Sequence, residues 1–193
     1  GPVEEFCRMV DSWTMHHTMQ MPTKLLDFLR INGFLGMIIP KQYGGKAFSA
    51  YAHSQILIKI SGRSITAVST LAVPNSLGPA ELILHYGTEA QKDYYLPRLA
   101  RGEEIPCFAL TEPHAGSDAG SMTSSGVVFK GDDGKLYMKL NWNKRWITLA
   151  AISTVLGLAF KLKDPDNLLG KGEDVGITCA LIPSNTKGVI LGK

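Results

Sequence analysis

The chain has 193 residues, a formal net charge of +3, and 45% hydrophobic against 19% charged residues. These values are ordinary for a globular protein and leave room for one large domain or two small ones. The basic residues form no cluster, which argues against a nucleic-acid surface, and solvated strand faces are the expected place for Lys130, Lys135, Lys139 and Lys144.

The first half of the chain has the spacing of amphipathic helices. One apolar stripe, with intervals of three and four residues, predicts a first helix through Val3, Phe6, Val10 and Trp13. Pro22 suits the first position of a second helix, which is expected to stop at Gly33. Ser49 can cap a third helix. The buried face of that helix is expected to carry Ala52, Ile56 and Ile60.

The last helical segment carries start and stop signals. Thr88 and Gln91 have the spacing of a capping box, in which two side chains satisfy backbone N–H groups at a helix start. Pro97 and Gly102 are expected to end the helical half, because proline and glycine interrupt helices.

The second half of the chain has the period of strands. Asp133-Gly134 is a hairpin signal after residues 127–129. Residues 152–162 predict a buried strand, and residues 189–191 predict the start of another. A half-buried strand is predicted by the alternating apolar residues Leu136, Met138, Leu140 and Trp142.

Helices therefore come first and strands second, with a boundary near Glu104. That order favours an α+β class or two domains over an alternating βαβ arrangement. We expect an all-α domain at residues 1–104 and a β domain at residues 105–193.

The stretch at residues 105–121 carries the strongest chemical signal. An apolar strand runs into a loop that contains Gly116, Ser117, Gly120 and Ser121. Glycine lets a ligand approach the main chain closely, and N–H and hydroxyl groups bind anions such as phosphate. The alternative is an ordinary surface turn, in which these residue types are also common.

Cysteines, histidines and apolar runs exclude other classes. Cys7, Cys107 and Cys179 are odd in number and form no CxxC pair, so neither a zinc site nor a disulfide scaffold is indicated, and a reducing cytosolic setting fits best. The histidines lack ligand spacing, no metal is expected, and His114 is expected to be a solvated loop residue. The longest apolar run, residues 149–160, is too short to span a bilayer.

Two motifs together resemble the signature of the acyl-CoA dehydrogenase family. The first joins Ala109-Leu110-Thr111-Glu112 to Ala115-Gly116-Ser117-Asp118 and Ser121, and the second is Lys144-Arg145-Trp146-Ile147-Thr148. The resemblance covers nearly the whole chain. Residues 40–45 and 141–170 look most like the large bacterial enzymes of fatty-acid β-oxidation.

The resemblance implies FAD as the cofactor. A flavin needs an anion site, a flat apolar wall and hydrogen-bonding groups near its ring, which Ser117, Trp146, and Thr111 with Thr148 could supply. A core aromatic on a strand is the alternative for Trp146. By resemblance, Ser117 also contacts the substrate, and the FAD-contacting residues are Phe108, Leu110, Thr111, Gly116, Ser117, Trp146 and Thr148.

The resemblance also implies a reaction and partners. Family members dehydrogenate an acyl-CoA and pass the electrons to electron-transfer flavoprotein, and the reaction expected here is the conversion of fatty acyl-CoA to trans-2-enoyl-CoA. Their glutamate base lies in a C-terminal helical domain, so we expect an N-terminal helical domain, an incomplete antiparallel barrel-like or sandwich β domain, and no catalytic residue here. The whole protein is expected to be a cytoplasmic homo-oligomer, with association with the inner membrane left open. Rival functions are an acyl-CoA oxidase and a non-enzymatic relative.

Two details of the motifs carry structural expectations. Glu112 is expected to position the loop, and burial of its carboxylate would require a nearby cation or backbone donor. Many family members follow the second motif with Asn and Gly, whereas Leu149, Ala150 and Ala151 follow it here, so a different local turn is expected.

Overall fold

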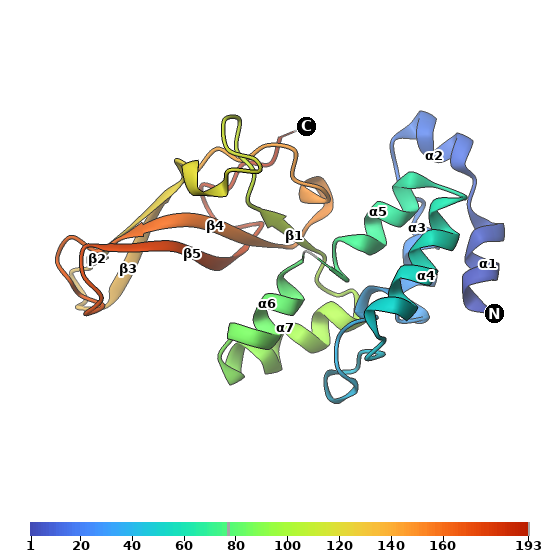
Figure 1. Cartoon of the computed structure of the whole chain (residues 1–193), viewed down its shortest axis with the longest axis horizontal. Coiled ribbons are helices and arrows are strands. Elements are labelled where there is room, and N and C mark those ends of the chain that lie inside the picture. The colour runs from blue at the N-terminus through green and yellow to red at the C-terminus, as the bar shows by residue number, and fades with distance from the viewer. Residues whose placement is uncertain (77, 193) are drawn as a thin grey trace.

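The computed structural model describes residues 1–76 and 78–192, with helices in the first half and a sheet in the second (Figure 1). The helices are α1 Pro2–Met9, α2 Ser12–Thr18, α3 Thr23–Ile31, α4 Ala50–Ser61, α5 Ile65–Ala72, α6 Pro79–Tyr86 and α7 Glu89–Arg101. The short 3-10 turns are η1 Phe34–Gly36, η2 Lys41–Tyr43, η3 Ala119–Ser121 and η4 Ala150–Ile152. The strands are β1 Pro106–Ala109, β2 Ser125–Lys130, β3 Leu136–Asn141, β4 Val155–Lys163 and β5 Asp174–Pro183.

Most predicted helix signals are confirmed, but the first apolar stripe is split. Ser49 accepts the Ala52 N–H at the start of α4, and the Thr88–Gln91 capping box opens α7. The predicted single helix from Val3 to Trp13 is wrong, because the Asp11 carboxylate accepts the Thr14 N–H and starts a new helix there. Trp13 consequently lies on the surface.

Helix α7 continues through Pro97, which corrects the expectation that this proline ends it. Proline removes one hydrogen bond, and the rest of the helix compensates by burying Leu96, Leu99 and Ala100. Gly102 ends the helix in the left-handed region at φ +69°.

The helical half has a core of side chains from α1, α3 and the η1 turn. Phe6, Phe28 and Phe34 place their ring centroids 6.0–6.4 Å apart, within the range of favourable aromatic pairs. Next to this core, η1 packs directly on α7. A Cβ at Gly36 would lie 2.7 Å from the Cα of Ala100, so the two backbones touch at this point.

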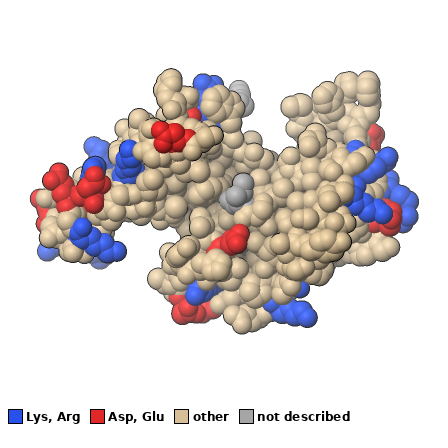
Figure 2. Space-filling model, in the orientation of Figure 1, with Lys and Arg blue, Asp and Glu red and all other residues tan. Residues whose placement is uncertain are grey.

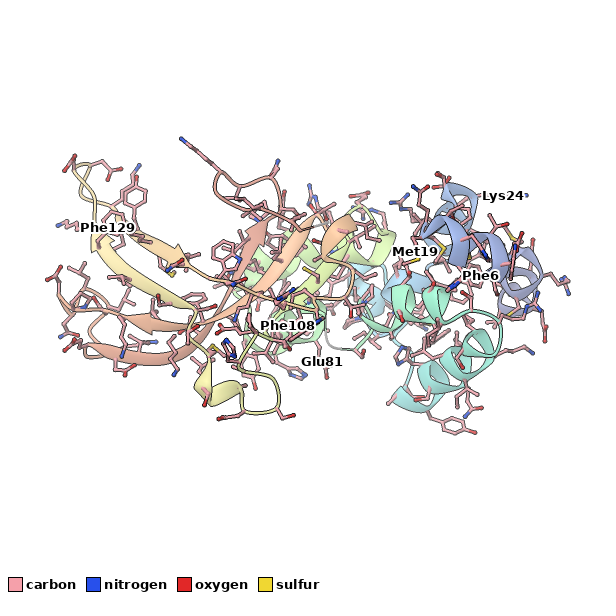
Figure 3. The ribbon with its side chains drawn as sticks, turned by 90° about the horizontal axis from the view of Figure 1, so that it is seen from above. Phe6, Met19, Lys24, Glu81, Phe108 and Phe129 are labelled. Atoms are coloured by element: carbon pink, nitrogen blue, oxygen red, sulfur yellow. The ribbon has the colours of Figure 1, made fainter. Side chains whose placement is uncertain are left out.

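Strand β4 organises the sheet. Residues 155–158 pair in parallel with β1, and residues 161–163 pair in parallel with β2, along the same edge of β4. Strand β5 pairs antiparallel with the other edge, and β3 pairs antiparallel with β2 across the predicted Asp133-Gly134 hairpin. The β2–β3 hairpin therefore extends away from the helices, with Phe129 near its far end (Figures 1 and 3).

The α+β organisation is confirmed, while the pairing is mixed rather than wholly antiparallel. β1 and β2 run parallel to β4 because the chain leaves the sheet between them and returns to the same edge. Residues 189–191, predicted to start a strand, have no strand partner among the described residues, and Val189 instead packs against the sheet core. None of the described helices is long and apolar enough to cross a membrane.

Helix α6 contacts the sheet at Gly157 of β4. A Cβ there would lie 3.0 Å from Cγ of Pro79 and 3.2 Å from Cδ2 of Phe108, so a small residue is required for this approach. The contact brings the helical half against the strand that leads into the first motif.

We expect Gly36→Ala to lower the free energy of unfolding by about 1–3 kcal/mol, because the new methyl group would overlap the α7 backbone. Urea denaturation of the two proteins measures this difference. The control is Gly62→Ala at the end of α4, where the nearest atom to the new Cβ is the Lys59 carbonyl oxygen at 3.6 Å. Equal urea midpoints for the Gly36 variant and the wild type would contradict the packing described above.

Candidate functional site

The first motif forms a loop held at both ends by β4. Ala109 of β1 pairs with Leu158, and the chain rejoins the same edge where the Lys161 N–H donates to the Ser124 carbonyl oxygen at 2.9 Å. The residues between them form the motif loop, residues 110–124. Its backbone ends are fixed by the sheet, while most of its middle is exposed.

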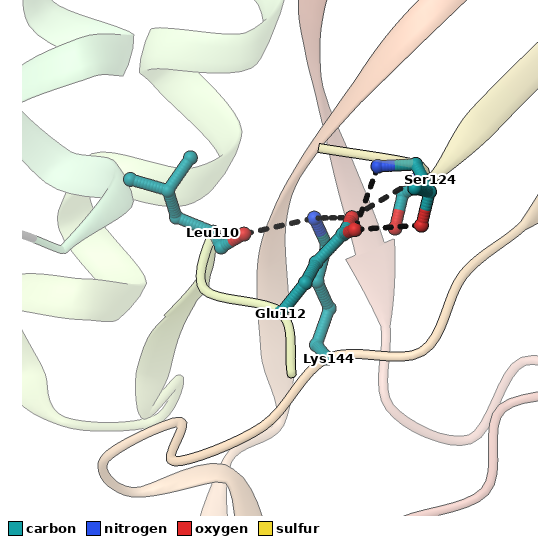
Figure 4. A network of polar contacts seen from close by, with 5 residues as sticks. Leu110, Glu112, Ser124 and Lys144 are labelled. Carbon is teal, nitrogen blue, oxygen red and sulfur yellow. Dashed lines mark hydrogen bonds and ion pairs between the residues drawn. The ribbon is translucent and has the colours of Figure 1, made fainter. Parts of the chain in front are cut away.

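The Glu112 carboxylate ties this loop together from inside (Figure 4). One oxygen, Oε2, accepts from Thr123 N–H at 2.7 Å and Thr123 Oγ1–H at 2.8 Å. The other, Oε1, accepts from Ser124 N–H and from Lys144 Nζ, each at 2.9 Å. Glu112 is only 3% exposed, and the expectation that its burial requires a nearby cation or backbone donor is confirmed, with both kinds of donor present.

Lys144 comes from the second motif and joins it to the first. Its Nζ also donates to the Leu110 carbonyl oxygen at 2.9 Å, and the Arg145 N–H donates to the Thr111 carbonyl oxygen at 3.0 Å. The Lys144 side chain is 4% exposed, which corrects the expectation that it is solvated. The two motifs, far apart in sequence, therefore lie side by side (Figure 4).

The environment of Glu112 determines its protonation. Burial raises the pKa of its carboxyl, but the hydrogen bonds from Lys144 and from the backbone of Thr123 and Ser124 lower it by more. The pKa therefore lies far below the ordinary value of 4.5. Glu112 is ionised at neutral pH, and it is poorly suited to be a general base, which needs a pKa near the working pH.

The predicted cofactor-contacting residues share one property: none is buried. Phe108, Leu110 and Thr111 are half-buried, and the exposed members are Gly116, Ser117, Trp146 and Thr148. In the same loop, Glu112, Ala115 and Met122 are buried and hold it in place. Buried and exposed side chains thus divide the motif into a holding set and a set open to a ligand.

Gly116 is not required by the fold. A Cβ at this position would have no heavy atom within 4 Å, and its φ is not positive. The main chain at Gly116 is therefore open to solvent, and its role in binding an anion stays a prediction.

Trp146 lies outside any strand and is 73% exposed, so the alternative of a core aromatic on a strand is wrong. Its backbone has φ +56°, and the Arg145 guanidinium carbon lies 5.5 Å from its ring centroid. Three residues later Leu149 adopts φ +69°, at the position where the sequence departs from the Asn-Gly of the family pattern. A left-handed conformation costs a branched side chain roughly 1–2 kcal/mol.

Two hollows on opposite faces of the sheet are each lined by one of the predicted cofactor-contacting residues. Phe108 and Gly157 line one of about 390 Å³ against α6, and Figure 3 shows Phe108 at the end of the sheet near the helices. Trp146 lines another of about 490 Å³ together with Ala109 and Leu156. Successive strand residues point to opposite faces, so the sheet separates the two hollows. Contact of one flavin with all seven predicted residues stays a prediction.

Sequence reasoning missed the role of Lys144 and of residues 123–124. The spacing of the lysines within residues 130–144 is typical of a solvated strand face. The sequence indicated a nearby cation only through the requirement that Glu112, if buried, must have a partner. Thr123 and Ser124 carried no signal, because their backbone N–H groups are the main donors.

The other ionisable groups of residues 1–76 and 78–192 lie in clusters too small to hold a metal ion. No group of three or more His, Cys, Asp or Glu side chains that could hold a metal occurs there, and His114 is exposed as expected. On the face shown in Figure 2, Lys and Arg side chains lie mainly toward the two ends, interspersed with Asp and Glu. They form no continuous basic patch on that face.

Comparison with known proteins agrees with both halves of the chain. The model for the acyl-CoA dehydrogenase N-terminal domain matches residues 3–103, and that for the acyl-CoA dehydrogenase middle domain matches residues 107–193. A 3-(aryl)acrylate reductase of Clostridium sporogenes is 38% identical over 91% of this chain and 44% of its own length. An acyl-CoA dehydrogenase of Bacillus subtilis is 34% identical over 93% of this chain and 44% of its own length.

A solved structure extends the comparison to three dimensions. The glutaryl-CoA dehydrogenase of Mycobacterium smegmatis in complex with FADH2 is 27% identical, with a TM-score of 0.78 over 97% of this chain and 45% of that chain. The chain thus spans less than half the length of these relatives.

The lowered pKa of Glu112 predicts a specific pH dependence of stability. Because the unfolded carboxyl binds a proton more readily than the folded one, the stability from its ionised form is fully present above pH 4.5 and is lost as the pH falls below that value. We expect Glu112→Gln to flatten the dependence of the free energy of unfolding on pH below 4.5. Urea titrations at several pH values measure the two slopes, and identical slopes would contradict the assignment.

Proposed function

The chain belongs to the acyl-CoA dehydrogenase family, and we propose that it supplies the helical domain and a flavin-contacting part of the β domain of an FAD-dependent oxidoreductase acting on acyl-CoA. The carrying observation is the direct contact between the two motifs, made by Lys144 with Leu110 and Glu112. The substrate class that we propose is fatty acyl-CoA, converted to trans-2-enoyl-CoA in β-oxidation. The resemblance of residues 40–45 and 141–170 supports this choice.

The residues present fit FAD in their chemistry. We propose that the open backbone at Gly116 and the exposed Ser117 hydroxyl bind the pyrophosphate, since N–H and O–H donors in a glycine-containing loop suit an anion. The exposed Trp146 would contact the ring, with Thr111 and Thr148 as hydrogen-bonding neighbours. Phe108 and Leu110, both half-buried, would add apolar contact. FAD, when bound, supplies the electron-accepting chemistry of the reaction.

The proposed contacts contain no group suited to abstract a proton. They are aromatic, aliphatic, glycine and hydroxyl residues, and the one acidic residue that holds the motif, Glu112, is already ionised and saturated with donors. Glu112 therefore maintains the shape of the site. A base from outside these two domains is part of the proposal.

The proposed partners follow the family resemblance. Ser117 is proposed to contact acyl-CoA as well as the cofactor, and its exposed position in the motif loop leaves it accessible. Electron-transfer flavoprotein is the proposed electron acceptor, and the whole protein is proposed to be a homo-oligomer.

We expect this chain alone to bind FAD weakly and to show no acyl-CoA-dependent dye reduction. It lacks a base among the proposed contacts, and a missing acid–base group costs roughly 10²–10⁴ in rate. Flavin fluorescence titration and a dye-reduction assay measure both properties, with the chain continued to the length of its relatives as the comparison. Turnover by the chain alone would show that the site is complete within it, and absence of FAD binding and turnover in the longer protein would refute the proposed function.

We expect Gly116→Ala to weaken FAD binding in the longer protein while the free energy of unfolding of its apo form changes by less than about 1 kcal/mol. The methyl group would occupy space that the fold leaves open but a bound anion would use. The matched control is Gly62→Ala in the helical half, where the new Cβ would make only an ordinary contact with the Lys59 carbonyl oxygen at 3.6 Å, and it should leave FAD affinity unchanged. Wild-type affinity for the Gly116 variant would argue against the loop as the pyrophosphate site.

A further inference from the structure

We infer that Lys144 and Glu112 are positioning residues that couple the phosphate-binding loop to the ring-contacting segment, so that FAD affinity depends on their pairing. This inference rests on the proposed function. Neither residue is among the proposed cofactor contacts, and both act through neighbours that are.

Glu112 closes the motif loop. Its backbone N–H donates to the Ala115 carbonyl oxygen at 2.9 Å, and its carboxylate binds Thr123 and Ser124 at the far end. Gly116 lies between these two attachments and is open to solvent. Glu112 therefore holds both ends of the segment that presents the anion donors, one through its backbone and the other through its side chain.

Lys144 and Arg145 align the second motif with the loop. Lys144 donates to the Leu110 carbonyl and the Glu112 carboxylate, and the Arg145 N–H donates to the carbonyl of Thr111 between them. Lys144 and Arg145 thus hold the three consecutive residues 110–112. Trp146 follows immediately, with its backbone turned to φ +56°, so the start of the ring-contacting segment is fixed relative to the loop.

The ion pair between Lys144 and Glu112, which couples the two motifs, is buried. The two side chains are 3% and 4% exposed, so water cannot replace a lost partner. Removal of one partner of a buried ion pair leaves an uncompensated charge and is strongly destabilising, whereas replacement of both partners by well-packed apolar groups of similar volume is often tolerated. This asymmetry separates a role in the stability of the fold from a role in the geometry of the site.

The experiment compares Lys144→Met with the double variant Lys144→Met, Glu112→Gln, both in the protein continued to the length of its relatives. Thermal unfolding of the apo form reports stability, and flavin fluorescence titration with the flavin absorbance spectrum reports the site. We expect the single variant to lose stability and the double variant to regain part of it, because the buried charge is removed while one backbone N–H of Thr123 or Ser124 faces the new amide nitrogen at position 112 instead of an acceptor. In both, FAD affinity should fall about tenfold or more, as for residues that orient metal ligands, because the Lys144 Nζ contacts are gone.

The control is Lys163→Met, which removes a lysine whose ion pair with Asp174 is exposed at 43% and 66% and lies in the same sheet. It should leave FAD affinity unchanged. Wild-type FAD affinity and spectrum in the stable double variant would overturn the inference, because the pair would then serve the fold alone. Failure of the wild-type protein to bind FAD would instead refute the proposed function.

A third variant decides the outcome if neither methionine variant folds. Thr123→Val removes one of the four hydrogen bonds on the Glu112 carboxylate at an exposed position and leaves the ion pair intact. We expect it to fold and to bind FAD about threefold or more weakly, in line with the loss of one hydrogen bond. Unchanged FAD affinity would overturn the inference.

Discussion

A buried carboxylate needs hydrogen-bond donors from the protein, because water does not reach it. The geometry around Glu112 follows from that requirement. Its two oxygens accept four hydrogen bonds from three residues, and one of these donors is the buried Lys144 ammonium. Leaving such a group without partners would be far more costly than assembling them. Because its donors belong to segments that are remote in sequence, satisfying one charge fixes the motif loop and the second motif together.

The sheet prepares this arrangement by giving the loop two fixed ends. Strand β4 pairs with β1 and β2 in turn along one edge, so the chain between them must leave the sheet and return. The same strand carries Gly157, where the absence of a side chain lets α6 approach Phe108. The motif loop therefore begins close to the contact between the helical half and the sheet.

The exposed residues of the motifs contrast with the holding set around them. Trp146 and Leu149 both adopt positive φ without being glycine, a conformation that carries a cost and is found at functional sites more often than elsewhere. Burial of Ala115 and Met122 beneath the loop, together with the ion pair, provides the surrounding stability that can maintain such a segment. The strain and the exposure of Trp146 occur in the same segment that Lys144 fixes.

The sequence by itself determined the features that depend on neighbouring residues. The Thr88–Gln91 capping box, the α+β order and the need of Glu112 for a cation follow from local spacing or from the chemistry of one group. The tertiary structure alone decided which cation it is, since Lys144 lies 32 positions away and its contact depends on the fold. Parallel pairing of β1 and β2 with one strand was likewise undetermined, because hydrogen bonds between strands distant in the chain leave no mark on the period of either.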